Sequence, residues 1–265
     1  MKAMELLSGY VTAPSTTFTA LTVCAGNSLT LRNAIEDTPI HLLAVWGKHQ
    51  TAGNIRVRSP QLHDNVQGIR LFNPAANASN LLPNQMKQML KAQDTLTVEL
   101  TGSGTGGDLE LASLLVFYED LPGIEGRFID AAELYGRTKQ IVTVENTLAL
   151  GTSGQYTGQE AINAEFDLLK ANTDYALIGY QVSAICGCVR WQGSDVGNLG
   201  IGGPGNHTDK HITANWFLDL SINYGMPLVP IFNSANKAGI LIDGQQDENG
   251  TDVTVTSIFA ELSPS

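Results

Sequence analysis

Short stretches of alternating apolar and polar residues recur along the chain and predict β-strands. Residues 96–100 (Leu-Thr-Val-Glu-Leu) and 253–256 (Val-Thr-Val-Thr) alternate throughout, and each lies beside a turn rich in Gly or Asp. Residues 55–58 and 141–144 show the same period of two. We therefore expect a protein built mostly of short strands.

Helical patterns are fewer and shorter. Residues 84–91 follow Pro83, which suits the first turn of a helix, and they predict two helical turns. Residues 213–224 predict a helix at the comparable place in the second half, and residues 130–135 predict a brief helix between the halves. We expect pieces of helix to interrupt each half at equivalent points.

The second half of the chain repeats features of the first. Residues 52–57 (Ala-Gly-Asn-Ile-Arg-Val) are echoed by residues 186–191 (Cys-Gly-Cys-Val-Arg-Trp), at an offset of 134 (187 − 53). At the same offset an apolar run ends in Trp46 in the first half and in Tyr180 in the second. These matches indicate two copies of one module.

The ends of the two halves also match. Phe117, near the end of the first half, lies opposite Phe259 at an offset of 142 (259 − 117). An offset that grows along the chain is what insertions in the loops between matched strands produce. We place the boundary in the linker after Pro122 and predict one module over residues 1–128 and another over residues 129–265.

The number of strands in each module fixes the predicted fold class. About seven or eight short strands with one crossover helix suit a jelly roll, in which two Greek keys close around one core. The prediction is therefore an all-β protein: two tandem jelly-roll β-sandwiches with short interrupting helices.

Composition and charge exclude some functions. The 265 residues include 15 Lys and Arg against 26 Asp and Glu, which gives a net charge of −11, and the basic residues form no run. Because phosphate contacts need clustered Lys and Arg, we expect no direct, sequence-specific binding of nucleic acid.

Cysteine content and hydropathy bear on the compartment. Three cysteines, an odd number, exclude a full internal disulfide framework, so we expect small buried thiols. Residues 1–8 lack the continuous apolar core of a signal peptide, and the apolar stretch at residues 175–189 is too short and too interrupted to cross a bilayer. We expect synthesis as a soluble protein in the host cytoplasm.

Two tandem jelly rolls in a chain of this length, with a short helix before the final hairpin of each, resemble a known family. They look like the double jelly-roll major capsid proteins of the adenovirus, tectivirus and corticovirus lineage. Residues 23–32 (Val-Cys-Ala-Gly-Asn-Ser-Leu-Thr-Leu-Arg) are similar to the opening of the corticovirus capsid protein. The resemblance covers nearly the whole chain in architecture and a few residues in identity.

The resemblance implies a structural virion protein, here of a bacteriophage, without enzyme activity or cofactor. Such proteins form homotrimers whose six jelly rolls make pseudo-hexagonal capsomers that self-assemble into an icosahedral shell. Their strands stand roughly upright to the shell, and loops form its outer surface. The implied partners are neighbouring capsomers, minor capsid or penton proteins and an internal viral membrane, and the implied location is the virion capsid.

A glycine-rich motif suggests a nucleotide site. Residues 102–107 (Gly-Ser-Gly-Thr-Gly-Gly) satisfy G-x-G-x-x-G and follow a predicted strand, as a dinucleotide loop requires. The counterpart loop, residues 244–250, precedes a strand rather than a helix. A hairpin tip explains both loops, so we assign no nucleotide.

Clustered acidic residues suggest a calcium site. Asp243, Asp247, Asn249 and Asp252 crowd one loop, although their spacing departs from the EF-hand pattern and no Glu stands at its twelfth position. The alternative is a solvated turn.

Two histidines suggest a zinc site. His207 and His211 are spaced as on a zinc-binding helix, but the residues before them (200–205, with Pro204) favour a loop, and no Glu lies between them. The default is a polar surface loop, and we assign no metal ligand.

Two rival functions come from other classes. Trp46, Trp191, Trp216, Tyr180 and Tyr224 could line a sugar-binding groove on a two-module lectin, but the matching apolar runs that end in Trp46 and Tyr180 favour a place in the core. A β-sandwich hydrolase is the third hypothesis. The chain has no Gly-x-Ser-x-Gly motif and its five histidines are scattered, so we assign no catalytic residue.

Overall fold

The computed structural model describes residues 1–264 except 36–37, 63, 74–87, 105–107, 150, 166, 206–209 and 248–249. Its strands form four antiparallel sheets, two of five strands and two of four. Each five-stranded sheet faces a four-stranded one. We call these pairs the first and the second sandwich, in chain order, and we call their five-stranded and four-stranded members the large and the small sheet.

The first sandwich covers roughly the first half of the chain. Its strands are β1 (Ala3–Thr12), β2 (Thr19–Ala20), β3 (Thr22–Val23), β4 (Ile40–Lys48), β5 (Gly53–Arg58), β6 (Ile69–Asn73), β7 (Gln88–Leu90), β8 (Thr97–Leu100) and β9 (Leu109–Tyr118). The large sheet has the order β3-β1-β9-β4-β7, and the small sheet has the order β2-β8-β5-β6.

The second sandwich follows the same plan. Its strands are β10 (Phe128–Ile129), β11 (Thr138–Leu148), β12 (Glu160–Ala161), β13 (Asp174–Val182), β14 (Cys188–Gln192), β15 (Ile201–Pro204), β16 (Val229–Asn233), β17 (Leu241–Gly244) and β18 (Val253–Leu262). The large sheet has the order β10-β16-β13-β18-β11, and the small sheet has the order β12-β17-β14-β15.

The strand order identifies both sandwiches as jelly rolls. Without the edge strands β3 and β10, each sandwich has eight strands, and numbering these from one to eight in chain order gives sheets 1-8-3-6 and 2-7-4-5 in both. This alternation between two sheets is the jelly-roll path. The predicted fold class, all-β with two tandem jelly rolls and short helices, is confirmed. The predicted boundary between residues 128 and 129 falls inside β10.

The described helices are short: α1 (Ala131–Arg137), α2 (Lys210–Ala214), α3 (Trp216–Tyr224) and the 3-10 turn η1 (Ser234–Gly239). The predicted helix at residues 130–135 is confirmed as α1, which Asp130 caps by accepting a hydrogen bond from the Glu133 N–H. The predicted helix at residues 213–224 is confirmed as α3, which ends at Gly225 in the left-handed conformation.

The helix predicted at residues 84–91 is wrong where the structure describes it. Gln88–Leu90 forms β7, which pairs with the start of β4, and residues 84–87 lie outside the described part. A short segment with weak helical propensity forms a strand here because the edge of β4 offers backbone hydrogen bonds.

A bulge in the third strand of each jelly roll aligns the two halves. The pairing with the last strand shifts at Leu43 in β4 and at Ile178 in β13, so the offset there is 135 (178 − 43). The predicted offset of 134 is therefore wrong for these strands. A slip of one residue reverses the face of every side chain, so Trp46 matches Gln181, and Val45 matches Tyr180.

The same bulge corrects the match between the last strands. Leu115 pairs beside the bulge of β4 and Ile258 pairs beside the bulge of β13, which gives an offset of 143 (258 − 115). The predicted match of Phe117 with Phe259 is thus also displaced by one residue. The offset of 134 remains correct for β5 and β14, where Arg56 and Arg190 each pair with an acidic residue of the seventh strand.

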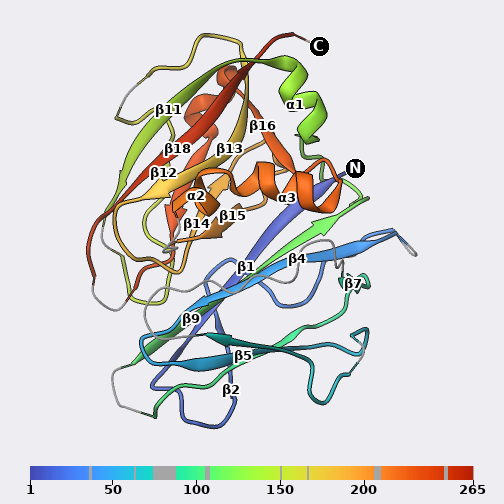
Figure 1. Ribbon diagram of the computed structural model, residues 1–265, viewed down its shortest axis with the longest axis vertical. Coiled ribbons are helices and arrows are strands. Elements are labelled where there is room, and N and C mark those ends of the chain that lie inside the picture. Colours follow the sequence, from blue (N-terminus) through green and yellow to red (C-terminus); the bar gives the residue numbers. More distant parts are fainter. Residues whose placement is uncertain are drawn as a thin grey trace.

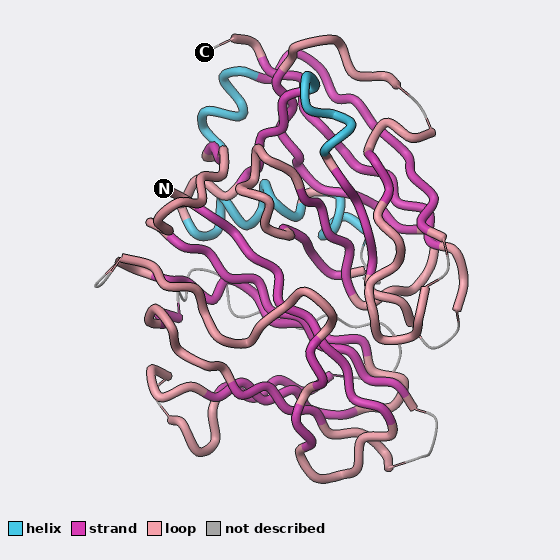
Figure 2. The backbone as a smooth tube through the Cα atoms, turned by 180° about the vertical axis from the view of Figure 1, so that it is seen from behind, coloured by secondary structure: helices cyan, strands magenta, loops and turns pink. Residues whose placement is uncertain are grey.

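The four sheets form one stack, in the order small, large, small, large (Figure 1). β15 of the second sandwich lies on β1 and β9 of the first, which brings the second small sheet against the first large sheet. Figure 2 shows the described helices gathered on the second sandwich, with strands and loops making up the first.

This stacking buries the first large sheet on both faces. Leu42, Val45 and Val116 belong to the core that this sheet shares with its own small sheet. Leu6 and Leu115 point the other way, into a cluster that continues into the second sandwich. Every residue of β9 is buried, which explains its nearly continuous apolar sequence.

Candidate functional site

The glycine motif at residues 102–107 is not a dinucleotide site. The segment that follows it is the strand β9, so the helix that would receive the phosphates is missing. The predicted hairpin tip is also wrong, because the loop joins β8 of the small sheet to β9 of the large sheet. Residues 105–107 lie outside the described part of the chain.

The residues considered as calcium ligands already have other interactions where they are described. Asp243 accepts two hydrogen bonds from Arg190, and Asp247 lies 2.7 Å from the Lys48 Nζ, with both carboxylates buried. Asn249 lies outside the described residues. Within the described part, no group of three or more His, Cys, Asp or Glu residues could hold a metal.

The two histidines are only partly placed. His207 lies outside the described residues, whereas the backbone of His211 belongs to α2. The expected loop is therefore wrong for Lys210–Ala214, which forms a helix.

The aromatic residues considered for a sugar groove are all buried: Trp46, Trp191, Trp216, Tyr180 and Tyr224. The predicted core position of Trp46 and Tyr180 is therefore confirmed. Trp46 and Trp216 meet edge to face with ring centroids 5.6 Å apart, although they come from different sandwiches. These rings stabilise the interior and do not form a groove open to a sugar.

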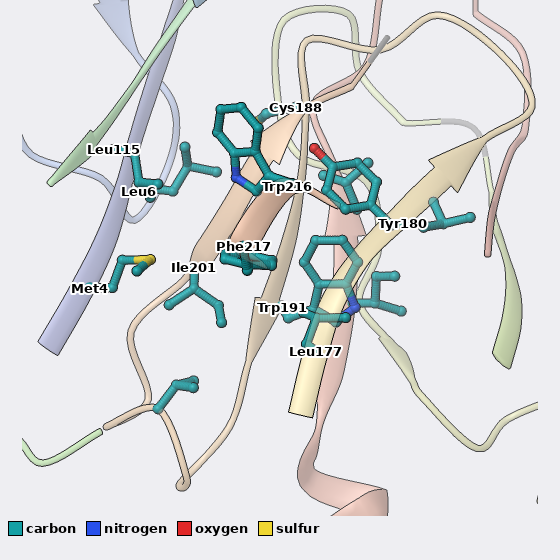
Figure 3. Close-up of a cluster of buried hydrophobic side chains, with 14 of the residues drawn as sticks. Met4, Leu6, Leu115, Leu177, Tyr180, Cys188, Trp191, Ile201, Trp216 and Phe217 are labelled. Atoms are coloured by element: carbon teal, nitrogen blue, oxygen red, sulfur yellow. The ribbon is translucent and has the colours of Figure 1, made fainter. Parts of the chain in front are cut away.

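The cluster around these rings runs from one sandwich into the next. Figure 3 shows Leu6 and Leu115 of the first sandwich on one side, Tyr180 and Trp191 of the second on the other, and Trp216 between them. One continuous hydrophobic cluster therefore joins the two sandwiches, and we call their contact the junction.

Backbone atoms approach closely at the junction. The Leu6 N–H donates to the carbonyl of Gly200 over 2.7 Å, and the Trp46 Nε1–H donates to the carbonyl of Gly187 over 3.1 Å. Gly202 has no side chain where a Cβ would lie 2.8 Å from the Leu6 Cδ2. The glycines of the second small sheet let the first large sheet lie directly on it.

The ion pair of Arg190 with Asp243 is buried at the junction. The Arg190 guanidinium binds Asp243 at two points, 2.9 and 2.6 Å, and its carbon lies 3.6 Å from the centre of the Tyr156 ring. Burial opposes the charge of Arg190, but the Asp243 hydrogen bond and the electrostatic interactions with Tyr156 and Asp243 together outweigh it and keep the pKa of Arg190 above its ordinary value. The Tyr156 hydroxyl donates to the Asn27 Oδ1 of the first sandwich over 2.8 Å.

Smaller polar contacts surround this pair. The Ser8 Oγ lies 3.3 Å from the Cys188 Sγ, and the Gln245 side chain donates to the carbonyl of Gly9 over 3.1 Å. Cys24, Cys186 and Cys188 are all buried thiols outside any disulfide, as predicted, and burial raises the pKa of Cys24 to about 12. The junction thus combines apolar packing with specific hydrogen bonds between the two sandwiches.

The ion pairs of the junction were not predicted from the sequence. The signal for one of them was present, because Arg56 and Arg190 occupy the same place in the repeated hexapeptides. Their acidic partners, Glu99 and Asp243, lie on another strand, and only the pairing of strands brings them together.

Sequence comparisons with known proteins identify no family for the chain. No protein-family model matches the chain, and no curated protein matches it. In the described part of the chain, no helix has the length and apolar character needed to cross a membrane.

Solved structures that match the chain include an exported protein and a major capsid protein. The exported protein XepA of PBSX has a TM-score of 0.25 and 10% identity, over 96% of this chain and 86% of XepA. The major capsid protein P2 of bacteriophage PM2 has a TM-score of 0.22 and 7% identity, over 100% of this chain and 98% of P2. These TM-scores are too low to support an inference, so function has to be argued from the sheets.

Proposed function

We propose that the chain is a virion structural protein, a major capsid subunit whose trimers form pseudo-hexagonal capsomers of an icosahedral shell. The observation that carries this proposal is the repeated jelly roll: the same eight-strand order occurs twice in one stack of four sheets. Because one fold serves many functions, the support comes from how the two copies are joined.

The two jelly rolls are joined head to tail. The large sheet of the first packs on the small sheet of the second, so unlike faces meet. Such a heterologous contact can be repeated between chains, where it closes into a ring or continues as a filament. In a closed ring of three copies, six similar sandwiches would surround one axis and give a nearly sixfold outline.

The proposal includes the partners and the location. Two further copies complete the trimer, neighbouring trimers and minor capsid or penton proteins complete the shell, and a viral membrane lies inside it. The chain would be made in the cytoplasm of a bacterial host and end in the virion. Enzyme activity and cofactors are not part of this role.

Negative-stain microscopy of the native source tests the proposal. We expect hexagonally tiled particles in which this chain is the most abundant protein. Particles that lack the chain would overturn the proposal. Retardation of the purified chain in gels containing polysaccharide would favour the sugar-binding alternative instead.

A further inference from the structure

A group of three side chains occurs in both sandwiches. In the second, Arg190 pairs with Asp243 and lies over the Tyr156 ring. In the first, Arg56 binds Glu99 over 2.8 Å, and its guanidinium carbon lies 3.9 Å from the centre of a phenylalanine ring. That ring belongs to Phe18, which directly precedes β2, and Tyr156 lies four residues before β12 (160 − 156).

The two groups occupy equivalent positions on the small sheets. Arg56 stands opposite Glu99 in the pairing of β5 with β8, and Arg190 stands opposite Asp243 in the pairing of β14 with β17. All four side chains point away from the core of their own sandwich. The repeat thus preserves an arginine, a carboxylate and an aromatic ring on the outer face of each small sheet.

Their surroundings differ. The Arg190 group is buried at the junction beneath the first large sheet, whereas the Arg56 group lies on the outermost face of the stack. Arg70 is exposed beside Arg56, and the neighbouring Phe72 is 61% exposed. We call this surface, with Phe18, Asn54, Arg56, Arg58, Arg70, Phe72 and Glu99, the arginine face.

The arginine face is basic on an acidic chain. It carries three arginines and one carboxylate, while the whole chain has a net charge of −11. Burial opposes ionisation of Glu99, but Arg56 and Arg58 outweigh it and hold its pKa below the ordinary value. The face therefore keeps an excess of positive charge that suits an acidic partner.

The outer face of the second large sheet lies at the opposite end of the stack. It is equivalent to the face that the first large sheet contributes to the junction. Aligned by the bulge, Leu115 matches Ile258 and Ser113 matches Thr256 on the large sheets. Because Ser8 pairs with Ser113 and Glu145 pairs with Thr256, Ser8 matches Glu145.

This second surface is partly open. Leu134 of α1 and Leu218 of α3 pack on one end of the sheet, but Thr143 and Glu145 are exposed and Ile141 is 54% exposed. We call the surface formed by Ile141, Thr143, Glu145, Gln181, Thr254, Thr256 and Ile258 the glutamate face. Its Glu145 carboxylate takes the position that Ser8 occupies in the junction.

We propose that the arginine face of one copy binds the glutamate face of a second copy of this chain, in the geometry of the junction. This inference rests on the proposed function and names the surfaces through which the trimer closes. The glutamate face is more polar than its counterpart in the junction, so the contact between copies relies more on charge. Glu145 of one copy lies near Asn54 and the arginines of the next.

Charge reversal tests the pairing of these faces. Arg70→Glu and Glu145→Arg, made separately, should each convert the trimer to a species near 28.3 kDa in light scattering. Arg70 and Glu145 are both exposed. The double variant should recover the trimer. Lys91→Glu, at another exposed position of the first sandwich, is the matched control and should leave the trimer intact.

Cysteine cross-linking tests the geometry directly. Ser8 and Cys188 lie 3.3 Å apart at the junction, and their counterparts are Glu145 and Asn54. The double variant Asn54→Cys, Glu145→Cys should form disulfides between copies and give a covalent trimer in a non-reducing gel. The pair Asn54→Cys, Lys91→Cys should not cross-link.

The outcomes separate this inference from the proposed function. A wild-type trimer that tolerates both charge reversals and yields no cross-link would overturn the inference and leave the capsid proposal standing. A wild-type chain that stays monomeric would overturn both. Cross-linked chains longer than three copies would contradict closure of the ring.

Discussion

Arg190 and Asp243 form a two-point ion pair that is buried where the two jelly rolls meet. Removing one partner leaves a buried charge without its counter-ion, which typically costs about 3–5 kcal/mol. We predict such a loss in the free energy of unfolding for Asp243→Asn, measured by urea denaturation.

The repeat supplies a control for this prediction. Glu99→Asn removes the matching carboxylate on the arginine face, where the side chains of its partners Arg56 and Arg58 are 18% and 28% exposed and can stay hydrated. For the monomeric chain, this variant should lower the free energy of unfolding by about 1 kcal/mol or less. Equal losses for the two variants would show that the junction does not isolate its ion pair from solvent.

Trp46 should contribute to stability through both sandwiches. Its ring packs on Trp216 and its indole N–H donates to the carbonyl of Gly187. Trp46→Ala should lower the free energy of unfolding by about 3–5 kcal/mol, and Tyr180→Ala by a similar amount. Unchanged thermal melting with loss of sugar binding would instead support a lectin.

Gly202 should be intolerant of a side chain. A Cβ there would clash with the backbone carbonyl of Val189 and lie 2.8 Å from the Leu6 Cδ2. Gly202→Ala should therefore disturb the pairing of β14 with β15, press against Leu6 of the first sandwich and lower the melting temperature. Gly136→Ala, in α1, meets no neighbour within 4 Å and should stabilise slightly through helix propensity. Equal melting temperatures for the two variants would contradict the packing at the junction.

Glu110 should make stability depend on pH. Its carboxylate is fully buried in the first sandwich and accepts hydrogen bonds from Gln50 and Thr51, and burial raises its pKa from 4.5 to about 7. A carboxyl group with a raised folded-state pKa favours folding when protonated. The contribution of protonated Glu110 to the free energy of unfolding is complete below pH 4.5 and is lost as the pH rises through about 7.

Glu110→Gln should remove this dependence. The variant stays neutral, so it should exceed the wild type in unfolding free energy by about 1–3 kcal/mol at pH 8 and match it near pH 4.5. Denaturant titrations at several pH values measure the difference. A variant that is less stable than the wild type at pH 8 would show that the ionised carboxylate is well solvated.

Local patterns predicted most of the fold because strand period and repeat are local properties. Residues 96–100 and 253–256 form strands where alternation placed them, and α1 begins after Asp130. The repeated hexapeptide predicted two copies of one jelly roll. Register could not be predicted, because the bulges at Leu43 and Ile178 appear only when the strands pair.

The candidate site was harder to predict because it depends on contacts between the halves. Asp243 and Asp247 looked like calcium ligands in the sequence, but each faces a basic side chain from another strand. Trp46 was expected in the core, yet its contact with Trp216 joins two sandwiches. Such pairings follow from tertiary packing rather than from spacing along the chain.

The mass of the purified chain in solution tests the central claim most directly. Multi-angle light scattering at micromolar concentration should give three times the chain mass of 28.3 kDa. A single species at the mass of one chain would contradict the account.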